Sequence, residues 1–405
     1  MLVSRRLVDI RQYSPAWRLW PETDAVIAAL TCDGGNVRFV GGCVRDALLG
    51  IETEDIDMAT DLLPDAVVTC LEKAGITAIP TGIDHGTVTA VLKKRHFEIT
   101  TLRVDIKGHG RHADVAFTQD WESDAERRDF TFNALYLDPK GKLTDPVGGL
   151  ADLKTGYVRF IGSAEERIRE DRLRVLRFFR FFARFGANNP DEDAVQACTC
   201  AASDLCDLSV ERVQKELTLL LAAENPYPAL VLMRKTGVLE AIVGSVDMAK
   251  LKSLLSLDIK SDALQRFAAL LGGNHEKVLK LADKLRFSNK QKERLAVMCA
   301  GQVTADMSSQ ARKVALYQLG RQGFIDQTLL LWSDLGRQHD LASYFEDAAN
   351  WAAPVFPVTG GDLLKHGIAE GEALGRLLKR MQARWITSGF NLTKSELICE
   401  FLSDA

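Results

Sequence analysis

The sequence predicts an α+β fold, in which a mixed β-sheet head is followed by an all-helical remainder. Strand-like and helix-like segments alternate before residue 161, and beyond it the strand patterns fade while helical periodicity continues almost to the end. The 405 residues also exceed a single domain of about 150 residues. Breaks containing asparagine and proline divide the chain further, and the predicted segments are 1–160 (head), 161–225 (neck), 226–355 (body) and 356–405 (tail).

The composition is that of an ordinary globular protein. Hydrophobic residues make up 46% and charged residues 26%, which excludes a disordered or collagen-like chain. No uncharged apolar run approaches the roughly 18 residues of a membrane span, and the eight cysteines lack the spacing of a disulfide framework. We therefore expect reduced thiols, no membrane and a cytoplasmic protein. The net charge of −4 leaves a nucleic-acid partner open, because phosphate binding depends on where basic residues lie.

Short helices and strands are expected to alternate in the head, and helices alone to follow it. A helical pattern begins at Pro21, and the Gly34-Gly35 turn leads into a short apolar strand. In the head, the predicted helices are 21–30, 44–49 and 65–75, and the predicted strands are 37–40, 55–58, 88–92 and 97–102. In the remainder, the predicted helices are 167–185, 209–223, 228–239, 262–271 and 275–285.

A glycine-rich turn follows the first predicted strand. In Gly41-Gly42-Cys43-Val44-Arg45-Asp46, the two glycines let a ligand approach the backbone closely, and a beginning helix offers free N–H groups to a phosphate. Arg45 adds a fixed positive charge. The segment is therefore interpreted as a cradle for a polyphosphate held by Gly42 and Arg45, although an isolated Gly-Gly pair is also typical of a plain strand-to-helix turn.

Two carboxylates follow this turn at the spacing of a strand. Asp55 and Asp57 lie two residues apart, so that on a strand both face the same side and can share divalent cations. Two metal ions held in this way activate a hydroxyl nucleophile and stabilise a leaving pyrophosphate. Glu98, in the predicted strand 97–102, is a candidate third carboxylate. Acidic surface pairs and nucleotide-sugar glycosyltransferases show the same Asp-x-Asp pattern.

Two arginine-bearing segments add candidate nucleotide contacts. Arg127 and Arg128 suit the phosphates of a triphosphate or of RNA, although read alone they are an exposed basic pair. Further on, Asp171 and Arg174 place an acceptor beside a donor on a predicted helix. Cytosine and adenine each present an amino donor beside a ring-nitrogen acceptor, whereas guanine and uracil present the opposite order. The pair therefore favours C and A, and the alternative is a solvated helix face.

With these motifs, the chain resembles the class II tRNA nucleotidyltransferases, the bacterial-type CCA-adding enzyme and poly(A) polymerase family of the DNA polymerase beta superfamily. The family motifs occur in the family's order and span roughly residues 37–217. They are Gly41–Asp57, Arg127–Ala134, the set Glu170, Asp171 and Arg174, and Leu208–Arg212 with Glu216. In the family pattern, Arg177 and Arg180 continue the nucleotide contacts.

The resemblance implies template-independent addition of C, C and A to the 3′ end of tRNA from CTP and ATP, with release of pyrophosphate. Mg²⁺ is the expected cofactor, the tRNA 3′ end is the expected partner, and no stable protein partner is implied. The implied residues are Asp55 and Asp57 for catalysis and metal binding, Gly42, Arg45 and Arg128 for the triphosphate, Asp171 and Arg174 for the base, and Arg177 and Arg180 for support of nucleotide binding.

Some features depart from the family or leave alternatives open. Arg172 stands where the family has proline or another uncharged residue, a departure at the start of the helix that follows, and the reading pair is expected to be retained. The segment Arg103–Asp114 is long and polar enough to be the family's flexible loop, and the tail is expected to bind tRNA. A poly(A) polymerase shares nearly every motif, and a catalytically idle RNA-binding protein on the same scaffold is the alternative from another class.

Overall fold

The computed structural model describes residues 7, 15–32, 34–106, 115–187, 189–336, 339 and 341–402. The chain forms two compact units, Met1–Gly244 and Ser245–Ala405. The head, neck, body and tail expected from the sequence are a finer division and remain a prediction. The first unit holds every motif discussed above, so its sheet and helices position the candidate site.

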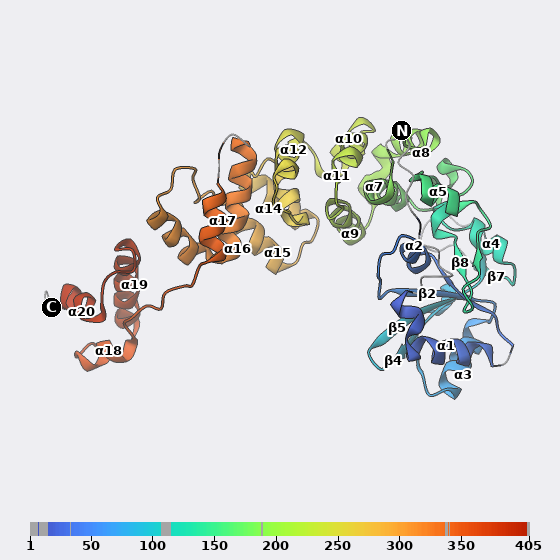
Figure 1. The fold of residues 1–405 in the computed structure, drawn as a ribbon, viewed down its shortest axis with the longest axis horizontal. Helices are drawn as coiled ribbons and strands as arrows, with labels where there is room; N and C mark the ends of the chain where they lie inside the picture. The colour runs from blue at the N-terminus through green and yellow to red at the C-terminus, as the bar shows by residue number, and fades with distance from the viewer. Residues whose placement is uncertain are drawn as a thin grey trace. The chain divides into compact units, whose positions relative to one another are not determined.

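The described residues of the first unit form a seven-stranded sheet with the order β3-β4-β5-β2-β1-β8-β9 (Figure 1). Neighbouring strands run antiparallel except β2 and β5, which are parallel. The strands are β1 (Val37–Val40), β2 (Ile56–Thr60), β3 (Thr77–Gly82), β4 (Thr87–Leu92), β5 (Arg95–Thr101), β8 (Tyr136–Leu137) and β9 (Leu143–Thr144). This mixed sheet confirms the predicted α+β head.

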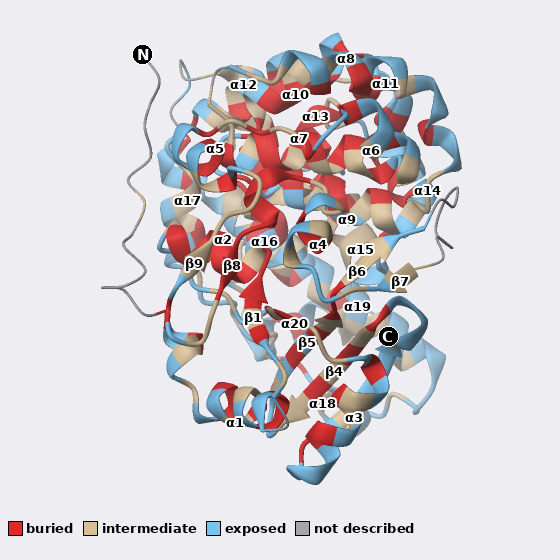
Figure 2. Ribbon diagram, turned by 90° about the vertical axis from the view of Figure 1, so that its right-hand side faces the viewer, coloured by how far each residue is buried: buried red, intermediate tan, exposed pale blue. Residues whose placement is uncertain are grey.

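Helices cover one face of this sheet and leave part of the other face accessible. Helices α1 (Pro21–Thr31) and α3 (Pro64–Lys73) pack together, and α3 contacts β3 and β4. Side chains alternate along a strand, and in β4 Val88 is fully buried whereas Thr89 is half-buried. The inner strands supply much of the buried core, visible along β1 (Figure 2). Polar side chains of β2, β4 and β5 therefore share the accessible face.

The helix expected over residues 167–185 is two helices, so that prediction is corrected. Helix α6 (Ala164–Glu170) ends before Asp171, whose extended backbone (φ −150°, ψ 104°) interrupts the helix. The carboxylate of Asp171 accepts a hydrogen bond from the backbone N–H of Leu173, at 3.1 Å, and so forms a local turn just before the next helix, α7 (Leu173–Phe185). Asp171 is therefore not on the helix that carries Arg174, and the two side chains are not placed side by side by one regular helix.

Aromatic rings join α7 to the segment that follows the arginine pair. Phe181 lies 5.1 Å and 5.2 Å, centroid to centroid, from Phe130 and Phe132, and Phe185 lies 5.9 Å from Phe132. All four rings are buried. The 127–135 segment is largely non-helical and contains only a short 3₁₀ turn, Thr131–Asn133. The ring cluster, rather than a helix, fixes this segment against α7.

The remaining helices of the first unit include those predicted at 44–49, 209–223 and 228–239, the last with a break, and three that the predicted helices do not cover, at 121–126, 149–155 and 192–200. The sequence pattern 228–239 is split by Gly237, whose φ of 75° ends one helix and begins the next. The helices not yet named are α2 (Gly42–Leu48), α4 (Trp121–Glu126), α5 (Gly149–Thr155), α8 (Glu192–Cys200), α9 (Val210–Leu221), α10 (Tyr227–Lys235) and α11 (Val238–Val243). The expected flexible loop Arg103–Asp114 begins with the short strand β6 (Arg103–Asp105), which pairs with β7 (Val115–Phe117) just after the loop, and its residues 107–114 lie outside the described residues.

The second unit is helical throughout its described residues, as the sequence predicts. Its helices are α12 (Met248–Ser256), α13 (Ala263–Leu270), α14 (His275–Lys284), α15 (Asn289–Met298), α16 (Ser309–Leu335), α17 (Ala342–Ala349), α18 (Gly360–Lys365), α19 (Glu372–Thr387) and α20 (Lys394–Leu402). Separate apolar clusters form around Phe324 and around Trp385. Across the described part of the chain, no helix is both long and apolar enough to cross a membrane.

Candidate active site

The two candidate metal-binding carboxylates lie at the start of β2, next to a third on β5. Asp55 precedes the strand and is exposed, and Asp57 is its second residue and is half-buried. The parallel register pairs Asp57 with Glu98, so these side chains share the accessible face of the sheet. Burial, followed by the charges of Glu98 and Asp55, raises the pKa of Asp57 to about 6.

This carboxylate group has the chemistry of a divalent-cation site. Oxygen ligands suit hard cations, and the mutual repulsion that raises the pKa of Asp57 is relieved by a bound positive charge. Within the described ranges, no three Asp, Glu, His or Cys side chains come close enough together to hold a metal ion by themselves. Magnesium sites in nucleotide enzymes commonly use one or two carboxylates and complete the coordination with substrate phosphates and water. The residues therefore fit a metal ion that binds together with a triphosphate.

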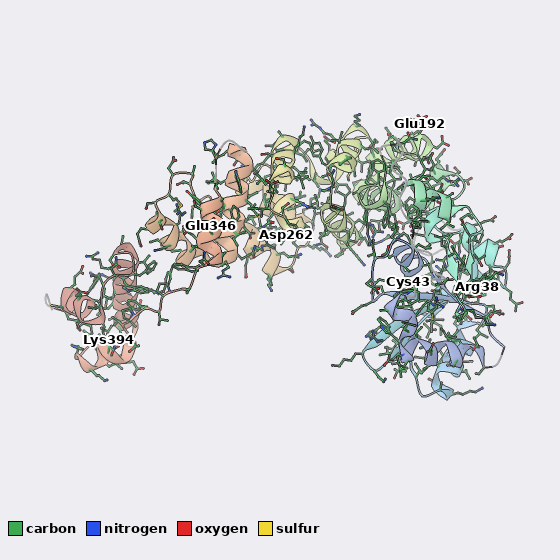
Figure 3. All side chains as sticks on the ribbon, in the orientation of Figure 1. Arg38, Cys43, Glu192, Asp262, Glu346 and Lys394 are labelled. Atoms are coloured by element: carbon green, nitrogen blue, oxygen red, sulfur yellow. The ribbon has the colours of Figure 1, made fainter. Side chains whose placement is uncertain are left out.

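The glycine turn brings its backbone directly beside Asp57. Gly41 adopts φ 74° and ψ −127°, and a Cβ built on it would lie 3.8 Å from Asp57 Oδ2 and 3.9 Å from Arg128 Nη1. Gly42 begins α2. Cys43 on this helix (Figure 3) donates its thiol hydrogen to the backbone oxygen of Asp57, at 3.5 Å. The turn, one carboxylate and one arginine therefore meet at a single point.

Replacing Gly41 by alanine is expected to reduce both stability and nucleotide binding. The positive φ costs a non-glycine residue about 1–2 kcal/mol, and the new methyl group would stand between Asp57 and Arg128. Gly34→Ala is the matched control, because Gly34 also has a positive φ, 87°, but nothing lies within 4 Å of its added Cβ. Thermal unfolding should show a lower Tm for both variants, whereas only Gly41→Ala should raise the KM for CTP. An equal KM in the two variants would contradict this role of Gly41.

Arg45 is held more firmly by the protein than the sequence suggests. Its side chain is 6% exposed, donates to Asp46 Oδ1 at 2.9 Å and to Asn133 Oδ1 at 2.6 Å, and lies 4.8 Å from the Phe185 ring centroid. Burial lowers the pKa of Arg45. One terminal nitrogen, Nη2, lies 3.7 Å from the position of a Cβ on Gly42. Any contact of Arg45 with a triphosphate would therefore occur at the Gly42 backbone.

Arg128 is oriented toward Asp57 by a buried carboxylate. Asp124, which has no exposed surface, accepts hydrogen bonds from Arg128 Nη2 at 2.9 Å and from Arg127 Nη2 at 2.6 Å. Tyr136 donates its hydroxyl to the same carboxylate at 2.7 Å. Burial alone would raise the pKa of Asp124, but the charges of Arg128 and Arg127 outweigh it and lower that pKa to about 2. The Nη1 atom of Arg128 is left directed at Gly41 and Asp57.

Arg177 and Arg180 of α7 are paired with carboxylates from other elements. Arg177 donates through Nε to Asp129 Oδ2 at 2.7 Å, and Arg180 forms an ion pair of 2.8 Å with the buried Glu216 of α9. Burial alone would raise the pKa of Asp129, but the charge of Arg177 lowers it to about 2. These arginines brace α7 against its neighbours, and their expected contacts with a nucleotide stay a prediction.

The predicted base-reading residues lie close in the chain, but each has another partner. Asp171 accepts from Arg212 Nη2 at 2.6 Å, and Arg174 pairs with Glu170 and donates to the backbone oxygen of Arg167 at 3.0 Å. Both side chains are partly exposed. A nucleotide base would have to replace or extend these bonds in order to be read by the pair.

Asp124 is the important residue that the sequence motifs did not indicate. Asp124 and Arg128 are four residues apart, a spacing that brings helical side chains together and that could have identified the pair. Asp129 and Glu216 are in the predicted motifs, but their arginine partners lie 48 and 36 positions away and could not be assigned from spacing. The register between Asp57 and Glu98 was likewise not visible in the sequence.

Comparison with known proteins finds similar proteins over most of the chain. Family models match at residues 37–159, described as "Poly A polymerase head domain", and at 189–249, described as "Probable RNA and SrmB- binding site of polymerase A". The mitochondrial CCA tRNA nucleotidyltransferase 1 of Mus musculus is 34% identical over 415 residues, covering 98% of this chain and 94% of the relative. A CCA-adding enzyme of Oceanobacillus iheyensis is 40% identical over 207 residues, 51% of this chain and 50% of that protein. The crystal structure of a Bacillus stearothermophilus CCA-adding enzyme in complex with CTP matches with a TM-score of 0.74 and 25% identity, covering 95% of this chain and 98% of that one.

Proposed function

The chain belongs to the CCA-adding enzyme family of tRNA nucleotidyltransferases, and from this membership we propose that it adds C, C and A to the 3′ end of tRNA. CTP and ATP are the donors, and pyrophosphate is released. The observation that carries the proposal is that Glu98 on one side of β2, and Gly41 with Arg128 on the other, lie around Asp57. This arrangement combines carboxylate oxygens that can bind a metal ion with an arginine and a backbone turn that suit phosphates.

A divalent metal ion is implied by the family, and we propose Mg²⁺ held by Asp55 and Asp57, with Glu98 beside them. When bound, the ion would polarise the phosphoryl group and favour the ionised form of the attacking hydroxyl. Arg128 would neutralise charge on the triphosphate, and its hydrogen bonds to Asp124 would keep it in place before the nucleotide arrives. The Gly41-Gly42 backbone would allow the phosphates to approach Asp57.

Base selection is proposed to depend on Asp171 and Arg174. Their carboxylate and guanidinium match the donor and acceptor edges of cytosine and adenine and mismatch those of uracil and guanine. Arg212, which donates to Asp171, would hold the carboxylate of Asp171 in place while the base binds. Arg177 and Arg180 would support this pair indirectly, through α7 and their carboxylate partners.

Replacing Asp171 by alanine is expected to reduce discrimination between CTP and UTP. Loss of the acceptor that pairs with the cytosine amino group removes about 1–3 kcal/mol of discrimination, roughly tenfold to a hundredfold in the ratio of kcat/KM values. Arg169→Ala is a suitable control, because Arg169 is an exposed residue of α6 paired only with Glu165 among the described contacts. Single-nucleotide addition with each triphosphate measures the ratio. An unchanged CTP/UTP ratio in Asp171→Ala would exclude Asp171 from base reading.

Primer extension by the purified protein with Mg²⁺ tests the function itself. The substrates are tRNA ending before CCA, tRNA ending in CC, and an unstructured RNA, each with CTP, ATP or both. Addition of C, C and A with a stop on tRNA supports the proposal. Long A tracts on unstructured RNA would identify a poly(A) polymerase instead, and binding of RNA without any extension would identify an idle RNA-binding protein.

The tail and the cellular compartment belong to the same proposal. Basic side chains of α19 would contact tRNA phosphates, although Arg376 and Arg384 already pair with Glu372 and Glu400. The eight cysteines lack the spacing of a disulfide framework, which supports a reducing compartment such as the cytoplasm. The mouse relative is named as mitochondrial, so subcellular fractionation is the direct test.

A further inference from the structure

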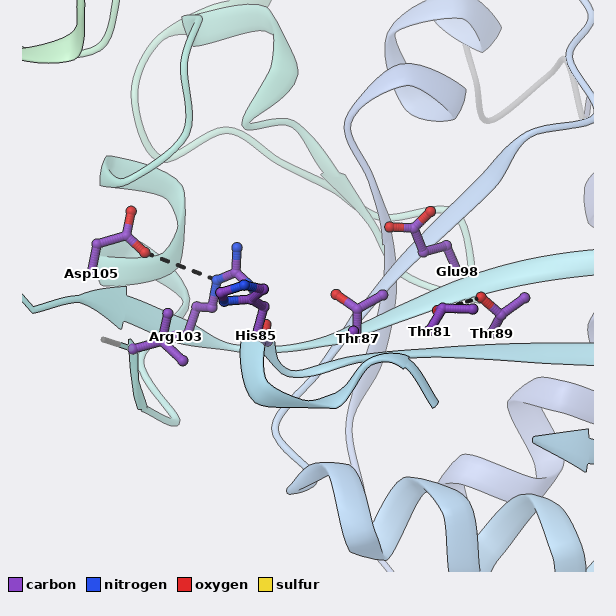
Figure 4. A pocket seen from close by; sticks show the side chains of 9 residues that line it. Thr81, His85, Thr87, Thr89, Glu98, Arg103 and Asp105 are labelled. Carbon is purple, nitrogen blue, oxygen red and sulfur yellow. Dashed lines mark hydrogen bonds and ion pairs between the residues drawn. The ribbon is translucent and has the colours of Figure 1, made fainter. Parts of the chain in front are cut away.

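A polar pocket lies on the accessible face of the sheet next to the carboxylates. It has a volume of about 530 Å³ and opens over β3, β4 and β5 (Figure 4). It is lined by Thr81, Gly82, His85, Thr87, Thr89, Glu98, Arg103, Asp105 and Val115. Its size lies within the range of about 300–1,000 Å³ that is usual for small-ligand sites. Except for Glu98, none of these side chains has a part in holding the metal ion or the triphosphate.

The pocket and the triphosphate contacts flank Asp57 from opposite directions. In the strand order, β2 has β1 on one side and β5 on the other. Gly41, at the end of β1, stands beside Asp57 together with Arg128. Glu98 on β5 pairs with Asp57 in register and also forms a wall of the pocket. Asp57 is thus the boundary between a cationic side and a hydroxyl-rich side.

Nucleotidyl transfer requires two ligands on opposite sides of the reacting phosphorus. The hydroxyl oxygen of the acceptor forms the new P–O bond as the bond to pyrophosphate breaks, with the two oxygens roughly in line. Because the triphosphate occupies the Gly41 and Arg128 side in the proposed function, the acceptor must approach over β5 and β4. We infer that this pocket binds the 3′-terminal nucleotide of the RNA acceptor, an assignment that rests on the proposed function.

The threonines of the pocket provide bonding capacity suited to ribose and phosphate oxygens. Thr87 and Thr89 are half-buried and lie on the same face of β4. The Thr89 hydroxyl lies 2.9 Å from that of Thr81, and the Thr87 hydroxyl lies 3.2 Å from that of Thr100. Each hydroxyl has one donor and two acceptor positions, so these contacts leave further positions free for a ligand. Recognition of the 2′-hydroxyl is the means by which proteins distinguish RNA from DNA.

The far end of the pocket adds a positive charge and an aromatic ring. Arg103 forms an ion pair of 4.0 Å with Asp105, and burial, followed by the charge of Arg127, lowers its pKa to about 10. A phosphate placed there would offset the repulsion between Arg103 and Arg127 and would compete with Asp105 for Arg103. Phe117 is 38% exposed and is on the same face of β7 as the lining residue Val115. An exposed aromatic ring beside a sugar-phosphate site offers a stacking surface for a base.

The double variant Thr87→Val, Thr89→Val tests the assignment, because valine keeps the shape and strand propensity of threonine and removes the hydroxyl. We expect the KM for the RNA acceptor to rise about tenfold or more while the KM for CTP changes less than about twofold. Thr69→Val is the matched control, since Thr69 is an exposed residue of α3 outside the pocket. A rise confined to the KM for CTP, or no change in either KM, would overturn the inference.

A binding measurement separates failure of the subsite from failure of the proposed function. Fluorescence anisotropy without any nucleotide compares an RNA minihelix that ends before CCA with the same minihelix carrying a 2′-deoxy terminal nucleotide. The wild type is expected to bind the all-RNA minihelix more tightly, and the double valine variant is expected to lose this difference. Equal binding of the two minihelices by the wild type would overturn the assignment. A protein that discriminates between them but extends neither would refute the proposed function and retain the subsite.

Discussion

Replacing Asp57 by asparagine lowers the rate of nucleotide addition by about a thousandfold or more without unfolding the protein. The rate falls because the amide carries no charge for the metal ion that the reaction requires, and metal-assisted phosphoryl transfer depends on several kcal/mol of charge stabilisation. Primer extension on tRNA ending in CC, with ATP as the only nucleotide, measures the rate of a single addition. Asp55→Ala is expected to show a similar loss.

The stability of the Asp57→Asn variant provides an independent check. The pKa of Asp57 is raised from 3.8 to about 6, so the ionised carboxylate is disfavoured in the metal-free folded state. Its ionisation therefore reduces stability as the pH rises from 3.8 through about 6, and at pH 7 the neutral amide should be at least as stable as the wild type. Asp65→Asn, an exposed site on α3, is the control for the charge change. A variant of lower Tm in metal-free buffer would mean that Asp57 has a structural role instead.

Removal of the Asp124 charge is expected to have the second-largest effect, on both stability and nucleotide binding. Asp124→Ala removes the buried partner of the ion pair and leaves the half-buried Arg128 unpaired with it, which costs about 3–5 kcal/mol of unfolding free energy. Asp124→Asn keeps the shape and is expected to lose less. In both variants the guanidinium of Arg128 is no longer fixed toward Asp57, so the KM for CTP should rise as the Tm falls. Denaturant unfolding and steady-state kinetics measure the two effects.

The pH dependence of the unfolding free energy distinguishes loss of the Asp124 charge from a general packing defect. The pKa of Asp124 is lowered from 3.8 to about 2, so its ionised form stabilises the folded state above pH 3.8, and this stabilisation is lost as the pH falls toward 2. The shift corresponds to about 2 kcal/mol. The difference in stability between wild type and Asp124→Asn should therefore be largest near neutral pH and should shrink below pH 3.8.

Tyr136→Phe is the matched control for the same buried cluster. It removes the hydrogen bond that the hydroxyl donates to Asp124 and the one that it accepts from Arg128 Nε, and leaves both arginine ion pairs in place. We expect a loss of about 1 kcal/mol and a smaller rise in the KM for CTP than in Asp124→Asn. If Tyr136→Phe raised that KM as strongly as Asp124→Asn, the ion pair with Asp124 would not be what orients Arg128.

The fold of the head was largely predictable because its elements have local signals. Turn glycines, short apolar runs and helix starts indicated β1, β2, β4, β5, α1 and α3 near their observed bounds. Strand β3 was missed, because its exposed threonines and Pro80 lack an apolar alternation and it forms the edge of the sheet next to β4. The continuous helix expected over 167–185 was wrong because Asp171 adopts an extended backbone and its carboxylate bonds to the N–H of Leu173, a local turn that helical periodicity does not record.

The sequence by itself determined the chemistry of the site: a carboxylate pair at strand spacing, a glycine turn before it, paired arginines and an Asp-Arg pair. These signals are encoded by neighbours within a few residues, so spacing alone reveals them. Only the tertiary structure decided which charged groups are neighbours. Asp57 lies beside Glu98, and ion pairs join Arg177 to Asp129, Arg180 to Glu216 and Arg212 to Asp171. Such pairs join residues some 36 to 48 positions apart, and they form because sheet register and the packing of α7 against its aromatic neighbours bring these side chains together.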